Sequence, residues 1–124
     1  MTYARFDVVI VPFPFTDRPV VRRRPALVVS TTEWNAASGH IVAAMITSAR
    51  QSSWPRDVPL TGLAAAGLTA RCVVRMKLLT LEEGLVIRRA GGLKGADATA
   101  VEEALAATLG WARLQESAAG FSAG

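Results

Sequence analysis

Short apolar runs, separated by glycine, proline and charged residues, follow one another along most of this chain. The first run, residues 6–13 (FDVVIVPF), is rich in β-branched residues, which favour strands. Similar runs predict strands at 25–30, 40–47, 70–78 and 85–89, and a short edge strand at 57–60. Between them we expect a mobile loop at 16–23, a turn with one helical turn at 31–39, and a connector at 61–67.

The period of the pattern changes near Thr99, where apolar positions begin to recur at helical spacing. Thr99 and Glu102 have the spacing of a capping box, in which each side chain bonds an early backbone amide. One terminal helix after several short strands predicts a mainly β protein: a small, strongly curved antiparallel barrel with a C-terminal helix. We expect a single domain over 1–115 and a frayed tail over 116–124. The apolar positions of the helix are Val101, Leu105, Leu109 and Ala112.

The strand predicted at 70–78 (ARCVVRMKL) has a distinctive alternation, because successive side chains of a strand point to opposite faces. One face should carry core residues, among them Cys72. The other should carry three cations, Arg71, Arg75 and Lys77. Such a face is either solvated, beside acidic neighbours, or the binding surface for an anion.

Charge favours a polyanionic partner. The 124 residues have a net charge of +4 at pH 7, and 51% of them are hydrophobic. Residues 1–95 carry 13 Lys and Arg against 6 Asp and Glu, a net charge of +7, while 96–124 carry 1 against 4, a net charge of −3. The basic part is therefore the body of the fold, which is compatible with nucleic acid but does not specify it.

Cysteine and histidine are too few for several kinds of site. With one cysteine, Cys72, and one histidine, His40, neither an intramolecular disulfide nor a cysteine-based zinc cluster can form. A two-histidine metal site or ribonuclease mechanism is excluded as well. We expect no metal, no cofactor, no membrane span and a cytoplasmic location, with Cys72 and His40 outside the catalytic chemistry.

Two short segments supply candidate polar groups. Three consecutive arginines, 22–24, precede a predicted buried strand, and Arg24 should be the most firmly held of the three because it lies at the strand entry. Its guanidinium could bind a phosphate through two parallel hydrogen bonds. Thr47 and Ser48 close another apolar strand. Hydroxyls at a strand end are more often turn residues than catalysts.

The aromatic residues allow two interpretations. Phe13 and Phe15 flank the expected mobile loop, where a nucleobase could stack, although Phe13 could equally pack in the core. The three tryptophans are scattered and are expected to be core or dimer-surface residues instead of a stacking platform. They are Trp34, Trp54 and Trp111.

These segments together resemble the MazF/PemK family of toxin ribonucleases, over nearly the whole chain to about residue 110. The segments are DVVIVPFPFTD (7–17), RRPALVVS (23–30), IVAAMITS (41–48) and VVRMKLLTL (73–81), followed by TLEEG (80–84) and a helix ending in LG (109–110). The resemblance implies a small SH3-like barrel with a C-terminal helix, similar to the CcdB and PemK toxins.

The resemblance also implies a function. Such a protein would be a homodimer that cuts single-stranded RNA without metal, leaving 2′,3′-cyclic phosphate and 5′-hydroxyl ends. A cognate acidic antitoxin would neutralise it and bind DNA together with it. By position, Arg24 and Thr47 match the family's catalytic arginine and threonine, and Arg75 and Lys77 lie on its RNA-contacting strand.

Arg23, Ser48 and Phe15 are further candidate RNA-binding residues. We expect Arg75 and Lys77 to bind both the RNA backbone and the acidic tail of the antitoxin, since both partners are polyanions.

Two features depart from the family pattern. The glycine usual before the first strand's aspartate is Phe6 here. Some members carry a histidine near the first loop or an aspartate at the position of Lys77, and both are missing here, so the resemblance does not name the group that takes the proton. Two alternatives stay open: a non-cleaving toxin similar to the gyrase poisons, and a regulatory nucleic-acid-binding relative.

Overall fold

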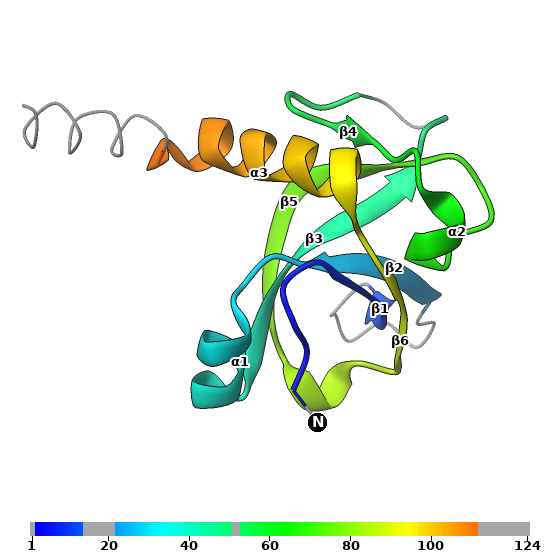
Figure 1. The fold of residues 1–124 in the computed structure, drawn as a ribbon. Coiled ribbons are helices and arrows are strands. Elements are labelled where there is room, and N and C mark those ends of the chain that lie inside the picture. Colours follow the sequence, from blue (N-terminus) through cyan, green and yellow to red (C-terminus); the bar gives the residue numbers. More distant parts are fainter. Residues whose placement is uncertain (1, 14–21, 51–52, 112–124) are drawn as a thin grey trace, which may run out of the picture.

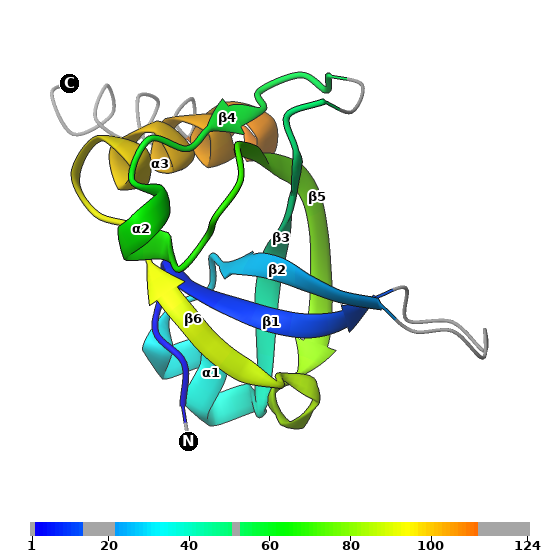
Figure 2. The ribbon, with the colours of Figure 1, turned by 90° about the vertical axis from the view of Figure 1, so that its right-hand side faces the viewer.

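Six antiparallel strands form one curved sheet in this computed structural model, which describes residues 2–13, 22–50 and 53–111. The sheet order is β4-β5-β3-β2-β1-β6, and it bends into a half-barrel (Figures 1 and 2). The mainly β fold with a C-terminal helix is therefore confirmed. The strands are β1 (Asp7–Phe13), β2 (Arg22–Val28), β3 (His40–Ser48), β4 (Val58–Pro59), β5 (Cys72–Glu82) and β6 (Arg88–Gly92).

Several strand boundaries differ from those expected. β2 begins at Arg22 and not at residue 25, because Arg22 and Arg23 continue the ladder opposite Phe13 and Pro12 of β1. β5 extends to Glu82 because β3 pairs with it as far as His40. A 3₁₀ turn, η1 (Glu83–Leu85), occupies the start of the strand expected at 85–89, so that β6 begins only at Arg88.

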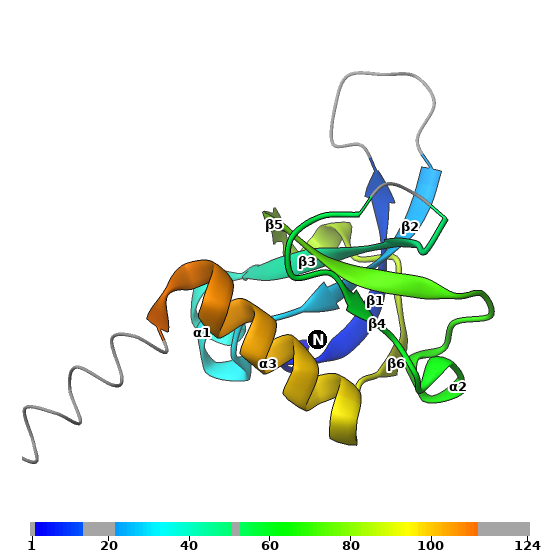
Figure 3. The same cartoon turned by 90° about the horizontal axis from the view of Figure 1, so that it is seen from above.

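Within the described residues, three α-helices join or follow the strands: α1 (Thr32–Ser38), α2 (Leu63–Ala66) and α3 (Gly95–Leu109). The first two lie in segments where we expected a turn and a connector. α1 forms because the Thr31 side chain accepts a hydrogen bond from the Trp34 amide and Gly39 ends the helix in the left-handed conformation. α3 contacts β4 and β5 at one edge of the sheet, and Figure 3 shows it beside β4.

The predicted start of the terminal helix is wrong. α3 begins at Gly95, with Thr99 inside the helix, so Thr99 and Glu102 do not form a capping box. The first turn is held by Asp97, which is 5% exposed and accepts hydrogen bonds from the Thr61 and Gly62 amides and the Thr61 hydroxyl. This tertiary contact anchors the first turn of α3, which has no side-chain cap, and no local pattern contains it.

The two faces of the sheet pack against different clusters of apolar side chains. One cluster joins Leu27, Ile46 and Val74 to Val101 and Leu105 of α3. The other gathers side chains of the opposite face, such as Val11, Ala26 and Met45. The even-numbered residues of β5 belong to the first cluster or pack on it, which confirms the predicted alternation. They are Cys72, Val74, Met76 and Leu78.

Phe6 has a backbone conformation that is unusual for a residue other than glycine. Its φ is +71°, in the left-handed region that glycine adopts most readily. The turn is closed by the Asp7 amide, which donates to the Ala4 carbonyl, and by the Ala4 amide, which donates to the Asp7 carboxylate. The turn therefore forms with phenylalanine at this position, and the Phe6 ring packs against the first cluster.

Some expectations lie outside the described residues: the loop at 16–21, Phe15, Ala112, and the tail over 116–124. Among the residues that are described, no helix is long and apolar enough to cross a membrane.

Candidate nucleic-acid interface

Arg24 and Thr47 come together through the pairing of β2 with β3. Ala26 pairs with Met45, and Arg24 and Thr47 each lie two residues away from this pair, on the same face of the sheet. Both side chains are half-buried and line an open cavity of about 250 Å³. The residues around this first cavity are Phe13, Arg24, Met45, Ile46, Thr47, Trp54, Arg75 and Lys77.

A second cavity, of about 320 Å³, adjoins the first. Arg24, Ile46 and Thr47 line both cavities and therefore stand at the rim between them. The second cavity adds a cation, Arg71, and the Ser48 hydroxyl, both exposed. Its other lining residues are Ile10, Pro25, Gly67, Leu68, Thr69, Ala70 and Cys72.

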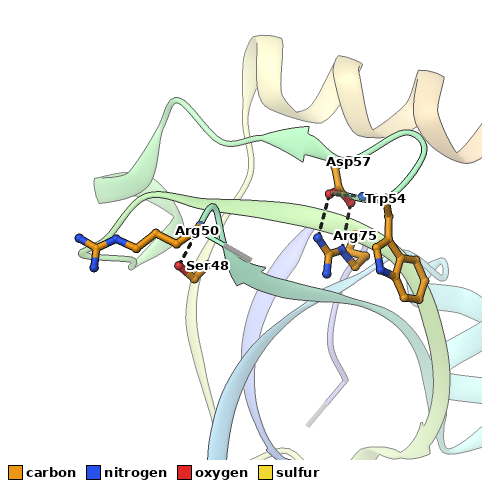
Figure 4. Close-up of polar contacts among 5 residues, drawn as sticks. All are labelled: Ser48, Arg50, Trp54, Asp57 and Arg75. Carbon is orange, nitrogen blue, oxygen red and sulfur yellow. Dashed lines mark hydrogen bonds and ion pairs between the residues drawn. The ribbon is translucent and has the colours of Figure 1, made fainter. Parts of the chain in front are cut away.

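Arg75 is nearly buried and forms an ion pair, which excludes the solvated alternative for this residue. Only 8% of the residue is exposed, and its guanidinium donates to both carboxylate oxygens of Asp57, from Nε at 3.2 Å and from Nη2 at 3.0 Å. Figure 4 shows this pair with the indole of Trp54 beside it. Of the interpretations left open for this face, an acidic neighbour is found for Arg75, while Arg71 and Lys77 are exposed.

Asp57 is ionised at neutral pH. Burial is the largest influence on this carboxyl and would raise its pKa. The hydrogen bonds from Arg75 and from the Trp54 amide, together with the Arg75 charge, outweigh burial and lower the pKa below its usual value. The pair is therefore a stable ion pair in the wall of the first cavity.

A tight turn over residues 54–57 brings Trp54 and Asp57 to this wall. The Asp57 amide donates to the Trp54 carbonyl, and the Trp54 amide donates to the Asp57 carboxylate at 2.9 Å. Pro55 favours the second position of such a turn. Arg56 occupies the third position with φ +65°, a conformation that costs a non-glycine residue about 1–3 kcal/mol.

Lys77 and Phe13 form another contact in the first cavity. The Lys77 ammonium lies 5.1 Å from the centre of the Phe13 ring, which is within the range of a cation–π interaction. Phe13 also packs against the second apolar cluster. The core alternative for Phe13 is thus supported, and the ring still forms part of the cavity wall.

The remaining predicted site residues lie less centrally. Arg23 is exposed, pairs with Pro12 in the ladder, and lines neither cavity. The Ser48 hydroxyl accepts a hydrogen bond from the Arg50 amide at 3.2 Å, in the turn that follows β3 (Figure 4). Phe15 falls outside the described residues.

His40 and Cys72 have ordinary structural surroundings. His40 lies at the first residue of β3, far along the strand from Thr47, with its Nδ1 2.9 Å from the Ser38 carbonyl oxygen. Cys72 is buried, and burial, followed by the charge of Asp97, raises the pKa of its thiol. A thiol that stays protonated is a poor nucleophile.

Trp54 and Asp57 are the site residues that sequence reasoning missed. We expected Trp54 to be a core or dimer-surface residue, yet it is 43% exposed in the cavity wall. Asp57 was expected only as the start of an edge strand. The available signal was the segment Trp-Pro-Arg-Asp, because proline and aspartate at this spacing are typical of a tight turn.

A larger cavity, of about 680 Å³, lies elsewhere, between α1 and α3. Its lining includes Glu102 and Glu103 of α3, with Arg5 and Trp34. Its two carboxylates would repel a polyanion, so this larger cavity suits such a ligand less well than the cavities around Arg24. In the described segments, no group of three or more His, Cys, Asp or Glu side chains is placed to hold a metal ion.

Comparison with known proteins gives matches in structure and in family. No curated protein sequence matches the chain. An endoribonuclease in complex with its cognate antitoxin, from a mycobacterial species, has 20% identity, a TM-score of 0.67, and coverage of 88% of this chain and 94% of that one. The MazE–MazF complex of Deinococcus radiodurans (Form-III) has 23% identity, a TM-score of 0.70, and coverage of 89% and 98%.

At this level of identity, the solved structures establish the shared fold. The family is established by the sequence, because residues 4–109 match the profile of the PemK-like, MazF-like toxins of type II toxin–antitoxin systems. This match spans both cavities, the Asp57–Arg75 pair and all of α3. The chain therefore belongs to the PemK-like, MazF-like toxin family.

Proposed function

We propose that this toxin is an endoribonuclease that cuts single-stranded RNA, messenger RNA included, in the cytoplasm. It selects its sites by sequence and works without a metal ion. The products carry 2′,3′-cyclic phosphate and 5′-hydroxyl ends. The observation that carries the proposal is the position of Arg24 and Thr47 on the rim shared by two adjoining cavities.

This position suits a strand that is cut internally. A phosphate at the rim is within reach of a cation and a hydroxyl, and the nucleotides before and after it have a cavity on either side. The first cavity adds Lys77, and the second adds Arg71 and Ser48. Exposed cations along such a path bind the backbone without reading its sequence.

The reaction uses a nucleophile that the substrate already contains. The 2′-oxygen attacks the adjacent phosphorus and loses its proton, the bond from phosphorus to the 5′-oxygen breaks, and the 5′-oxygen takes up a proton. The protein must align these groups and stabilise the added negative charge on the phosphorus oxygens. Arg24 supplies a permanent positive charge and Thr47 a neutral hydrogen-bond donor. Arginine does not act as the base, because its pKa exceeds about 12.

We further propose that a cognate acidic antitoxin regulates this activity. Both structures compared above are complexes of a toxin with its antitoxin. An acidic segment that orders on binding could cover the basic cavities, and it would then compete directly with RNA. The same antitoxin complex would bind DNA, and the toxin itself would be a homodimer.

The decisive experiment is incubation of the purified toxin with a mixed RNA in excess EDTA, followed by mapping of both ends of each product. We expect cuts at a recurrent sequence, with 2′,3′-cyclic phosphate and 5′-hydroxyl ends. The Arg24→Ala variant, prepared in the same way, controls for contaminating nuclease. Loss of cleavage in EDTA with recovery on adding Mg²⁺ would contradict metal independence. RNA binding without cleavage would identify a non-cleaving relative.

A further inference from the structure

Trp54 presents a large aromatic surface in a basic cavity. The residue is 43% exposed, although an indole is among the most apolar side chains. The Arg75 guanidinium lies 5.2 Å from its ring centre. The same cavity contains Arg24, Thr47 and Lys77. An exposed ring surrounded by cations is the combination with which proteins bind single-stranded nucleic acid.

The surroundings of Trp54 hold its ring in place before any ligand arrives. The Asp57 carboxylate accepts from the Trp54 amide and at the same time from Arg75, which stacks on the ring (Figure 4). The turn also keeps Arg56 at a φ of +65°, a conformation that persists only where the neighbouring contacts enforce it. A ring fixed in this way loses little conformational freedom on binding.

We propose that Trp54 is a stacking subsite for one nucleobase of the RNA, next to the phosphate at Arg24 and Thr47. Asp57 is its positioning residue, since it holds both the backbone of Trp54 and the guanidinium behind the ring. The inference rests on the proposed function, because it takes single-stranded RNA as the ligand of this cavity.

Trp34 provides a matched comparison within the same chain. It is also 43% exposed, but it lies on α1 in the cavity that contains Glu102 and Glu103. A nucleic acid would meet two carboxylates and one cation, Arg5, there. At Trp54 it would meet Arg24 and Lys77, while the charge of Arg75 is offset by Asp57. Exposure of an indole alone therefore does not distinguish the two residues, and the charge around it does.

The test measures RNA affinity in the absence of cleavage. The probe is a fluorescent RNA that spans a mapped cut site and has a 2′-deoxy nucleotide at the cut, which removes the nucleophile. We expect Trp54→Leu to weaken binding by about 5-fold to 150-fold, the range found when one base loses its aromatic partner. Trp54→Phe should restore much of the affinity, and Trp34→Leu should leave it unchanged.

Removal of single bases from the probe locates the stacked nucleotide. We expect one abasic position next to the cut to lower the affinity of the unmodified toxin and to leave that of Trp54→Leu unchanged. Circular dichroism and the thermal unfolding midpoint of each variant establish that it is folded. Since Trp54 is half-exposed on a turn, Trp54→Leu is expected to fold normally.

Two results would overturn the subsite. One is an unchanged RNA affinity for folded Trp54→Leu. The other is a loss of self-association or of antitoxin binding with RNA affinity intact, which would make Trp54 an anchor for a protein partner. Failure of the proposed function looks different: the toxin would bind RNA through Trp54 and cut none in the end-mapping experiment.

Discussion

Asp57 and Arg75 meet through two parallel hydrogen bonds in the wall of the cavity that also holds Arg24 and Thr47. Their side chains are only 12% and 10% exposed, respectively. Removing either partner would leave a nearly buried charge without its counterion, which is strongly destabilising. The positive charge at the surface of this cavity therefore comes mainly from Arg24 and Lys77.

Replacing Arg24 with alanine should lower the cleavage rate by about 10²–10³-fold, because one preorganised donor to transition-state charge is typically worth that much. Thr47→Ala should lose less, since it removes a neutral hydrogen bond. The matched control is Arg23→Ala, which removes the same charge one residue away, outside both cavities. Single-turnover cleavage rates of folded variants measure the effect, and an unchanged rate for Arg24→Ala would remove this residue from the site.

Reversing the charge of Lys77 should weaken binding of RNA and of the acidic antitoxin together. The Lys77→Glu variant should also flatten the salt dependence of RNA binding, because fewer counterions are released. Arg75→Glu is unsuitable for this purpose, since it would set a second carboxylate against Asp57.

The matched control for Lys77→Glu is Lys94→Glu, which makes the same charge change at an exposed residue just before α3. Affinities are measured across a salt series. If Lys77→Glu matches the unmodified toxin in both affinity and slope, Lys77 is an ordinary solvated residue.

The toxin should lose stability in acid, because protonation of Asp97 removes a contribution to the free energy of unfolding. Burial is the largest influence and would raise its pKa, but the hydrogen bonds from Gly62 and Thr61 lower the pKa below the ordinary 3.8. A lowered pKa in the folded state means that the stabilisation is complete above about pH 4 and is lost as the pH falls through the folded value.

Asp97→Asn should therefore be less stable than the unmodified toxin at pH 7, and the difference should shrink below about pH 4. Urea unfolding at a series of pH values measures it. Asp57 titrates in the same direction in both proteins, so its contribution cancels in the difference. If the difference in unfolding free energy between the two proteins stays constant down to pH 3, the stabilising role of the Asp97 carboxylate is contradicted.

Arg56→Gly should raise the free energy of unfolding by about 0.5–1 kcal/mol. Glycine adopts the left-handed conformation at φ +65° without strain, which stabilises the folded state. This gain in free energy exceeds the entropic cost of ordering the more flexible glycine on folding. Arg50→Gly is the control, because Arg50 is also an exposed arginine and does not have a positive φ. Denaturant unfolding measures the change in the free energy of unfolding of both variants. Equal destabilisation of the two would refute backbone strain at Arg56.

The toxin should sediment as a homodimer of about 26 kDa, twice the 13.1 kDa of the chain, at micromolar concentration. Large apolar side chains that stay exposed in the single chain, such as Leu109 at 51% and Ile87 at 42%, are candidates for burial in such an interface. A single species near 13 kDa would contradict the expected assembly.

The sequence alone determined the strands, the terminal helix and the two faces of β5. These features follow from local periodicity, because successive side chains of a strand point to opposite faces. Cys72, Val74 and Met76 therefore lie on one face of β5, and Arg75 and Lys77 lie on the other. Arg24 was expected to be the most firmly held of the three arginines because of a strand entry at residue 25. It is half-buried while Arg22 and Arg23 are exposed, but the strand begins at Arg22, so the expected reason was wrong.

Only the tertiary structure decided which charges remain exposed and which aromatic ring lines the cavity. Val58 of β4 pairs with Val74 of β5, and this register sets Asp57 beside Arg75 across 18 positions of sequence. The start of α3 was missed for the same kind of reason, because Asp97 anchors its first turn by accepting hydrogen bonds from the distant Thr61 and Gly62 amides. Such pairings depend on how distant segments fold against one another, and a pattern confined to neighbouring residues does not contain them.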